Sequence, residues 1–256
     1  MLPVAALNFP PIGELVDWKK FWLPGFNKPM LLVVLACIIT LALFLAAGRK
    51  KALVPTGVQN LVEMIVDFVT NGIILETIGE DGMVFLPYLT TLFMFILICN
   101  LFEIIPIAQF PPMSRMALPL FLALITWVIY NFMGIKRQGV GQYFKNNLFP
   151  PGVPKALYLL VTPIEFISNF LVRPFSLAVR LFANELAGHL LLVTFAVLTD
   201  TLLFHNSITF FKPIAILPAA MDVGVTGFEL LVAVLQAFIF TILTAVYIGL
   251  AVHPEH

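Results

Sequence analysis

Charge is the first property that this sequence has little of. The 256 residues include 14 Lys and Arg and 14 Asp and Glu, so 11% of the chain is charged while 61% is hydrophobic. A soluble globular protein is about 25% charged, and a disordered chain is poor in apolar residues and rich in charge. Both classes are excluded, and lipid must solvate the surplus apolar residues. The net charge of zero also gives no basis for nucleic acid binding, which requires a basic patch.

Cysteine is also scarce. Cys37 and Cys99 lie in separate apolar stretches without CxxC spacing, so they predict neither a disulfide framework nor a metal site. The sequence up to Lys20 lacks the basic n-region and the long apolar core of a cleavable signal peptide. No P-loop, catalytic triad, haem-binding histidine pair or metal-ligand cluster occurs in the sequence. We therefore expect no cofactor, no metal and no nucleotide hydrolysis by this chain alone.

Long apolar stretches are what the sequence has in abundance. About 20 apolar residues cross the hydrocarbon core of a bilayer as a helix. Such stretches occupy residues 30–48, 84–105 and 116–135, and longer ones occupy 156–204 and 213–252. The sequence predicts an all-α integral membrane protein with one membrane domain over residues 1–256. Within it, we expect an N-terminal segment (1–29), a first span (30–48), a two-helix hairpin (84–135) and a long helix pair (156–252).

The two C-terminal stretches are longer than a bilayer requires. A continuous helix of about 40 residues measures about 60 Å, twice the thickness of the hydrocarbon core. Each stretch is therefore either two spans joined by a tight turn or one long, steeply tilted helix. Pro163 and Pro174 can kink the first stretch, but no cluster of Gly, Asn and Ser divides it. This absence favours two long tilted helices.

Residues 58–78 form a different kind of segment. The apolar residues Val62, Ile65, Val66, Val69, Ile73 and Leu75 recur at helical spacing opposite Glu63, Asp67 and Glu76, which predicts an amphipathic helix. If this helix does not cross the membrane, the basic residues 49–51 and the basic loop 136–155 fall on one side, as the positive-inside rule favours. We therefore predict five crossings, with the N-terminus outside and the C-terminus in the cytoplasm. Lys19, Lys20 and Lys28 on the outer side argue against this topology.

Several ionisable residues lie within the apolar stretches, where a charge costs about 2.5–3.5 kcal/mol on insertion scales. An ionisable group at membrane depth is a functional candidate for that reason. The ionisable candidates, with their polar neighbours, are Glu103, Glu165, Asn169, Arg173, Arg180, Asn184, Glu185, His189, Asp200, Asp222, Glu229 and Gln236.

Helical periodicity sorts these residues into faces. One polar face of the first long helix carries Glu165, Asn169, Arg173, Ser176, Arg180 and Asn184, while His189 falls on the opposite face. On the second long helix, Asp222, Glu229 and Gln236 are spaced by sevens and share a face. Antiparallel packing of the two helices is expected to bring Gln236 near the level of Arg180 and His189 towards Glu229. His189 and Glu229 would then form a proton-handling pair.

Structural explanations remain open for each of these candidates. Arg180 can form a buried ion pair with Glu165 or another carboxylate that only holds the helices together. Glu165 and Arg173 can lie near a helix end and reach the interface. Glu103 can cap the end of the second span or line a water-filled path.

Five sequence runs resemble a known family. They are Arg173-Pro-Phe-Ser-Leu-Ala-Val-Arg180-Leu-Phe-Ala-Asn184-Glu-Leu-Ala-Gly188-His189, Asn100-Leu-Phe-Glu103-Ile-Ile-Pro106, Gly134-Ile-Lys136-Arg137-Gln-Gly139, Pro163-Ile-Glu165-Phe-Ile-Ser168, and the helix from Glu229 through Gln236 to Tyr247. Together they resemble the a subunits of F-type ATP synthases. The resemblance covers most of the chain from Val84 onward, and the run around Arg180 is highly specific.

The resemblance implies a stator subunit with two offset aqueous half-channels, in which proton translocation drives a ring of c subunits. Arg180 matches the arginine that faces the rotor carboxylate, with Asn184 and Gln236 beside it. His189 and Glu229 match two positions of one access channel; some members have the acid first and the histidine second. The remaining residues assigned to the proton path are Glu165, Ser168, Arg173, Glu103 and Asp222.

The same resemblance implies partners and a location. The partners are the c-subunit ring, the b-type subunits of the peripheral stalk, the rest of the synthase and the lipid bilayer. The location is a bacterial plasma membrane. Two other classes stay open: a secondary transporter, which would be expected to contain internal repeats or broken helices, and a purely structural membrane subunit.

Overall fold

The computed structural model describes residues 28–49, 55–105, 110–149, 154, 157–205 and 213–252. In that part of the chain all regular secondary structure is helical, as the sequence predicts. Six of its helical stretches are long and apolar enough to cross a membrane. The predicted N-terminal segment up to residue 27, Lys50, Lys51, and Pro106 of the Asn100 motif lie outside the described residues.

The first span is helix α2, Lys28–Arg49. Its 22 residues give a length of about 33 Å, which matches the hydrocarbon core. Large apolar side chains remain exposed along it, such as Ile38 (56%) and Leu41 (60%). Four of the 22 residues of this helix are buried by protein. Lipid therefore solvates most of its surface.

The amphipathic segment is a helix with one irregular turn. It consists of α3 (Val58–Val69), a π-helical turn (Thr70–Ile74) and α4 (Leu75–Thr77). Val62, Val69 and Ile73 are buried, as predicted. Leu75 was placed on the same face but is 43% exposed, and Ile74 and Ile78 are buried instead. The π turn adds a residue to one turn of the helix and so shifts the register after it.

The predicted two-helix hairpin is α5 and α6. A short 3₁₀ helix (Glu80–Phe85) leads into α5, Leu86–Ile104, and another (Pro112–Ser114) precedes α6, Ala117–Gln138. Helix α6 ends at Gly139, whose φ of 81° is in the left-handed region that glycine adopts without strain. Helix α7, Val140–Leu148, follows immediately. Helix α5 lies at the centre of the fold, where Leu89, Ile96 and Cys99 are fully buried.

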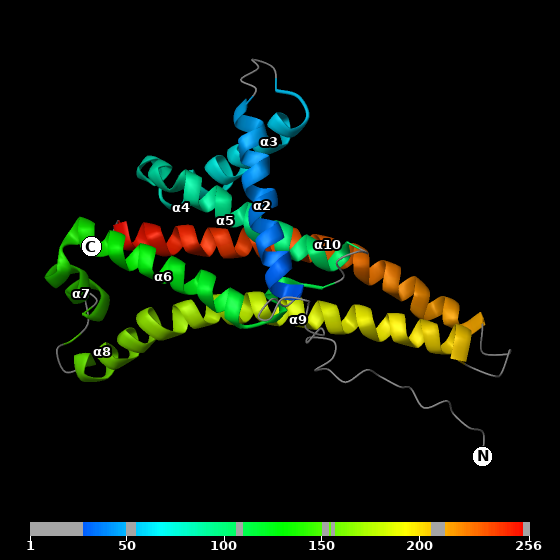
Figure 1. Ribbon diagram of the computed structural model, residues 1–256. Coiled ribbons are helices and arrows are strands. Elements are labelled where there is room, and N and C mark those ends of the chain that lie inside the picture. The colour runs from blue at the N-terminus through cyan, green and yellow to red at the C-terminus, as the bar shows by residue number, and fades with distance from the viewer. Residues whose placement is uncertain are drawn as a thin grey trace.

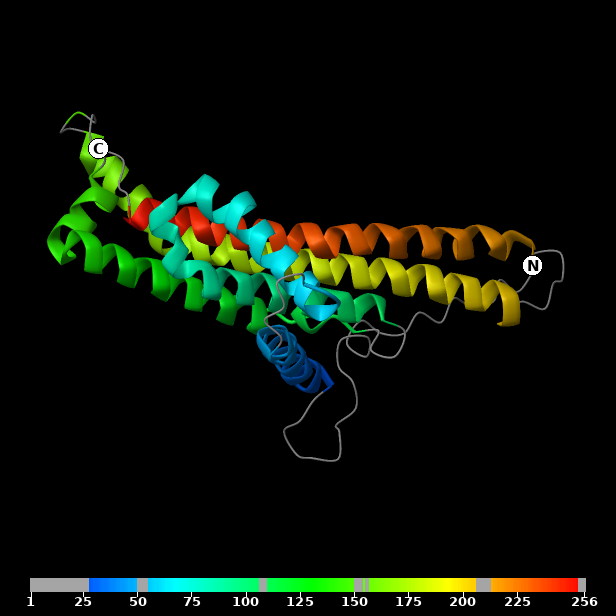
Figure 2. The same cartoon turned by 90° about the horizontal axis from the view of Figure 1, so that it is seen from above.

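The two C-terminal stretches form the long helices that the sequence predicts. The first joins α8 (Tyr158–Ile167), a π-helical turn (Ser168–Val172), α9 (Arg173–Asp200) and a final π turn (Thr201–His205). The second is α10, Ile216–Val252, with 37 residues and so a length of about 56 Å. Figures 1 and 2 show α9 and α10 side by side and extending well beyond the other helices.

Helices α9 and α10 run across the direction of α2 in Figure 1. If α2 crosses the bilayer along its normal, α9 and α10 must be steeply tilted. Their length requires the same tilt, because the hydrocarbon core is about 30 Å thick. The π turn of the first long helix lies between Pro163 and Pro174. Proline removes a backbone donor from the ladder, and the wider turn accommodates this without breaking the helix.

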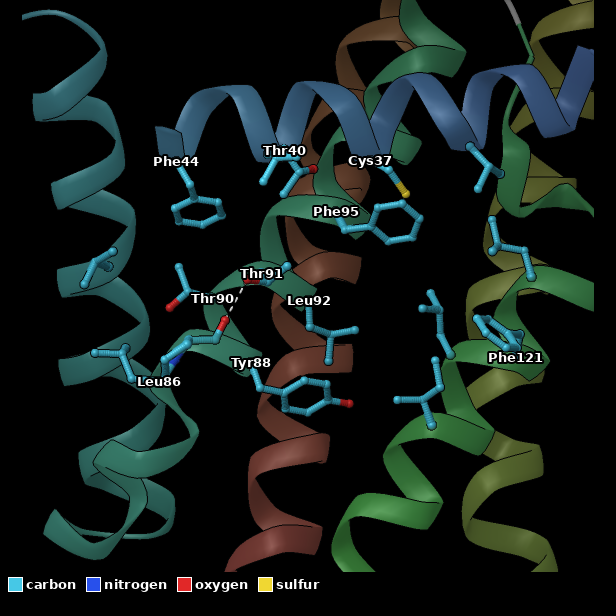
Figure 3. Close-up of a pocket in the computed structure, with 17 residues that line it drawn as sticks. Cys37, Thr40, Phe44, Leu86, Tyr88, Thr90, Thr91, Leu92, Phe95 and Phe121 are labelled. Carbon is cyan, nitrogen blue, oxygen red and sulfur yellow. Dashed lines mark hydrogen bonds between the residues drawn. The ribbon is translucent and has the colours of Figure 1, made fainter. Parts of the chain in front are cut away.

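An apolar cavity of about 770 Å³ lies between α2, α5 and α6. Figure 3 shows Cys37, Thr40 and Phe44 of α2 on one side of it, with Leu92 and Phe95 of α5 opposite. The cavity makes the thiol of Cys37 accessible.

The two thiols are therefore expected to differ sharply in reactivity. In the detergent-solubilised complex, a lipophilic maleimide should label Cys37, which is exposed, at least about tenfold faster than Cys99, which is fully buried and reacts only through local opening. Peptide mass spectrometry measures both rates, and a Cys37→Ser variant is the control. Equal labelling of the two cysteines would contradict this packing of α2 and α5.

Candidate functional site

Arg180 lies on the exposed face of α9. Its side chain is exposed, and within the described part of the chain it makes no hydrogen bond or ion pair. An intrachain ion pair with Glu165, the structural alternative for Arg180, is therefore not found among these residues. Because the flanking surface of α9 is apolar, the guanidinium is presented to whatever packs against this helix in the membrane.

A hydrogen bond joins the two long helices next to Arg180. The Nδ2 atom of Asn184, one turn beyond Arg180, donates to Oε1 of Gln236 on α10 at 2.8 Å. Gln236 is buried, and its Nε2 has no hydrogen-bond partner among the described residues. Antiparallel packing thus brings Gln236 to the level of the arginine, as expected from the spacing.

Acidic side chains and one histidine meet where α5, α9 and α10 are in contact. Glu103, His189 and Glu229 are all buried there, with 6%, 7% and 7% of their surface exposed. Nδ1 of His189 lies 3.9 Å from Oε1 of Glu103. The histidine, predicted to approach Glu229, is thus paired with the acid of α5. We call Glu103, Glu185, His189 and Glu229 the outer cluster, after the side of the membrane that we propose for it below.

Gly188 determines where the carboxyl group of Glu229 lies. A Cβ atom at position 188 would be 2.5 Å from Oε1 and 2.6 Å from Oε2 of Glu229. The absence of a side chain at this position lets the carboxyl group rest against the α9 backbone, directly beside His189. His189 and Glu229 therefore belong to one site, because Gly188, the neighbour of His189 in the chain, packs against the Glu229 carboxyl group.

Glu165 belongs to a second polar region, near the start of the first long helix. Its Oε2 accepts a hydrogen bond of 3.2 Å from Nδ2 of Asn169, and the same amide donates to the backbone oxygen of Asn147 at 3.1 Å. The hydroxyl of Tyr130 donates to the backbone oxygen of Asn169 at 3.0 Å. Ser168 is half-buried at the start of the π turn.

Arg173 completes this second region. Its guanidinium carbon lies 5.4 Å from the centre of the Tyr247 ring, a cation–π contact between α9 and α10. Beside it is a cavity of about 20 Å³, which holds about one water molecule. Tyr143 of α7 also lines the cavity; burial raises the pKa of its phenol, which stays protonated and donates to Oδ1 of Asn131 at 2.8 Å. We call Glu165, Ser168, Asn169, Arg173 and Tyr247 the inner cluster.

The two clusters are well separated along the helices, and Arg180 lies between them. Glu229 and Tyr247 are on the same helix, and at 1.5 Å per residue their separation along its axis is about 27 Å. Asp222 is half-buried and precedes Glu229 by seven residues on α10. It therefore lies about 10 Å closer to the turn of the α9–α10 hairpin. The arrangement is two polar regions at different levels of a helix pair, and between them lies an arginine with no ion-pair partner among the described residues.

The single polar face predicted for the first long helix is divided into two parts. Asn169 is buried against α6 and α7, whereas Arg180 and Asn184 are exposed. The π turn at Ser168–Val172 shifts the register within the stripe, so residues before and after it do not face the same surroundings.

One residue of the outer cluster was not assigned to the proton path from the sequence. Glu185 is 3% exposed and close to Glu103 and Glu229. The spacing contains the signal, because Glu185 precedes His189 by four residues and therefore shares its face of α9.

The chain is similar in sequence to known proteins over most of its length. The family model for the ATP synthase A chain matches residues 30–249. This chain belongs to the ATP synthase A chain family. It is 46% identical over 228 residues to ATP synthase subunit a of Parafrankia sp. (strain EAN1pec), covering 89% of this chain and 76% of that relative. It is 45% identical over 232 residues to that of Frankia alni, with 90% and 79% covered, and 40% identical over 243 residues to that of Granulibacter bethesdensis, with 95% and 91% covered.

Membership of the ATP synthase A chain family confirms the function predicted from the sequence. The protein is a multi-pass membrane subunit of an ATP synthase, proton-translocating and without catalytic activity of its own. The alternatives of a secondary transporter and of a purely structural subunit are thereby set aside.

Proposed function

We propose that the exposed face of α9, which carries Arg180, packs against a ring of c subunits. Arg180 then meets the buried carboxyl group of each ring subunit as it passes. One observation carries this proposal: an exposed arginine on an apolar membrane helix, with no hydrogen bond or ion pair in the described part of the chain. A charge at membrane depth needs a partner. A partner carboxylate on another subunit supplies one.

Arginine suits this position because its guanidinium does not release its proton under physiological conditions. It therefore cannot pass protons from one side of the membrane to the other. It attracts an arriving carboxylate and favours the charged form of that group, so the ring subunit releases its proton there. The hydrogen bond between Asn184 and Gln236 holds the two helices together beside it.

We further propose that each polar cluster lines one half-channel, an aqueous path reaching halfway across the membrane. The outer cluster, with Asp222 towards the hairpin end, lines the path from the outside. The inner cluster, including Glu165, Ser168 and Arg173, lines the path to the cytoplasm. Protons enter through one, travel round on the ring and leave through the other, because the positive charge of Arg180 opposes direct passage between them.

The proposed topology has five crossings and a cytoplasmic C-terminus. Helix Val58–Thr77 is long enough to cross, but its mean hydropathy of 1.3 is the lowest of the six candidates. Its amphipathic character supports a position in the interface or beside the bundle. The bacterial relatives support a bacterial plasma membrane, and the proposed partners also include b-type subunits of the peripheral stalk.

Cysteine cross-linking tests the proposed contact with the ring. In a background without native cysteines, Ala183→Cys places a thiol on the exposed face of α9, three residues from Arg180. It is expected to form a disulfide with a cysteine introduced beside the ring carboxyl, visible as a higher band on a non-reducing gel. Ala178→Cys is the matched control, since Ala178 is on the same helix but fully buried. Cross-linking at position 178 and not at 183 would overturn the proposed orientation.

A further inference from the structure

Glu185 is the most buried acid of the outer cluster, and nothing above gives its carboxyl group a part of its own in that cluster. Its side chain is 3% exposed, against 6% for Glu103 and 7% for Glu229. Its Oε2 has no hydrogen-bond partner in the part of the chain that the structure describes. A buried carboxyl group with an oxygen that lacks a hydrogen-bond partner is costly at membrane depth, so packing alone does not account for it.

The surroundings of Glu185 are themselves titratable. The carboxyl groups of Glu185 and Glu103 approach each other closely enough to interact directly, and Glu229 acts on Glu185 electrostatically. His189 lies one turn away from Glu185 on α9. Glu185 thus shares one buried site with the acid of α5, which lies 3.9 Å from His189, and with the acid of α10, which rests on Gly188.

This arrangement requires the site to hold protons. Two adjacent carboxylates repel each other, whereas a carboxylic acid and a carboxylate share a proton and attract. Three buried acids with one imidazole cannot all be ionised at membrane depth without a large cost. The direct contact of Glu103 with Glu185 is therefore stable when at least one of the two is protonated, and the shared proton can move between them.

We propose that Glu185 is a proton carrier that connects Glu103 to Glu229, so that the outer cluster is a proton-holding site of three carboxyl groups. A proton leaves a carboxyl oxygen of Glu103 and binds a carboxylate oxygen of Glu185. It then passes from Glu185 to Glu229, each step breaking one O–H bond and forming another. This inference rests on the proposed role of the outer cluster as a half-channel.

The test is passive proton conduction in membrane vesicles that hold the complete membrane sector. Glu185→Gln keeps the size and polarity of the side chain but cannot carry a proton, and Glu185→Asp keeps the carboxyl group. We expect Glu185→Gln to assemble normally and to conduct at least about a hundredfold more slowly, the lower end of the typical effect of losing a proton-transfer group. Glu185→Asp should recover at least half of the native rate, with a pH profile displaced from the native one.

Each outcome bears on the proposal. Native conduction by Glu185→Gln overturns it. Failure of both variants to assemble also overturns it, because the carboxyl group is then needed for packing. If Glu185→Gln alone fails to assemble, the pH profile of Glu185→Asp decides: a displaced profile supports proton transfer through residue 185, and an unchanged profile overturns it.

A parallel variant separates this inference from the proposed function on which it rests. Glu229→Gln removes the acid that both share. If Glu229→Gln blocks conduction while Glu185→Gln conducts normally, only the role of Glu185 is wrong. If both variants conduct normally, the outer cluster is not a half-channel, and the proposed function itself fails at this point.

Discussion

Replacing Arg180 with alanine is expected to abolish proton-driven ATP synthesis while leaving the synthase assembled. The structure separates these two effects. Arg180 is exposed and unpaired within the described residues, so its removal leaves no buried partner without a counter-charge in this chain. The loss of synthesis would therefore report the interaction with the ring. ATP synthesis in vesicles energised by a proton gradient measures the effect, and immunoblotting of the purified complex measures assembly.

Arg180→Lys is the matched variant for that experiment. Lysine keeps the positive charge but is a compact, more strongly hydrated ion that loses its proton more readily than arginine when buried. We expect synthesis to be strongly impaired and passive proton leak to stay below that of Arg180→Ala. A leaked proton dissipates about 2.3 kcal/mol per 100 mV. Growth on a respiratory carbon source should therefore be slower for Arg180→Ala than for Arg180→Lys. Normal synthesis by Arg180→Ala would refute the proposed role of Arg180.

Replacing Gly188 with alanine is expected to lower proton conduction by about ten- to a hundredfold, because a displacement of about 1 Å is enough to misplace a reacting group. The new methyl group would occupy the space of the Glu229 carboxyl, 2.5–2.6 Å from its atoms. The end of a flexible side chain can move aside, so assembly should be preserved. What changes is the position of the carboxyl group relative to His189 and Glu185.

Gly224→Ala is the control for this second prediction. Gly224 lies on α10, five residues before Glu229, and a Cβ atom there meets nothing within 4 Å. It should conduct protons at the native rate. Equal loss in the two variants would show that helical glycines matter here for reasons other than the position of Glu229, and an unaffected Gly188→Ala would contradict the geometry of the outer cluster.

Local sequence signals predicted the helices well. The first span was expected at 30–48 and lies at Lys28–Arg49; the third was expected at 116–135 and lies at Ala117–Gln138. Apolar length and charged ends determine such boundaries, and both are visible in the sequence. The π turns were not visible, because no residue type marks them. They explain why Leu75 is exposed where Ile74 is buried, and why Asn169 and Arg180 face different surroundings.

The candidate site was predicted in composition but not in its pairings. Asn184 and Gln236 were expected at one level and are joined by a hydrogen bond. His189 was expected to come towards Glu229, and the structure adds an acid that the spacing did not predict: Nδ1 of His189 lies 3.9 Å from Oε1 of Glu103. Helical spacing gives the direction of a side chain on its own helix, but it does not give the distance or rotation between helices. Glu103 reaches the site from α5, a helix far away in the sequence, and Glu185 becomes a candidate once that contact is known.

The sequence by itself determined that this is an integral membrane protein, that its C-terminal helices are long, and that a few ionisable residues lie at membrane depth. These properties follow from composition and periodicity, which need no knowledge of contacts. The tertiary structure alone decided that Arg180 has no partner among the described residues while Glu103, Glu185 and Glu229 are buried in one site with His189. The physical reason is that burial of a charge depends on which helices meet around it, and that is a property of packing between segments distant in the chain.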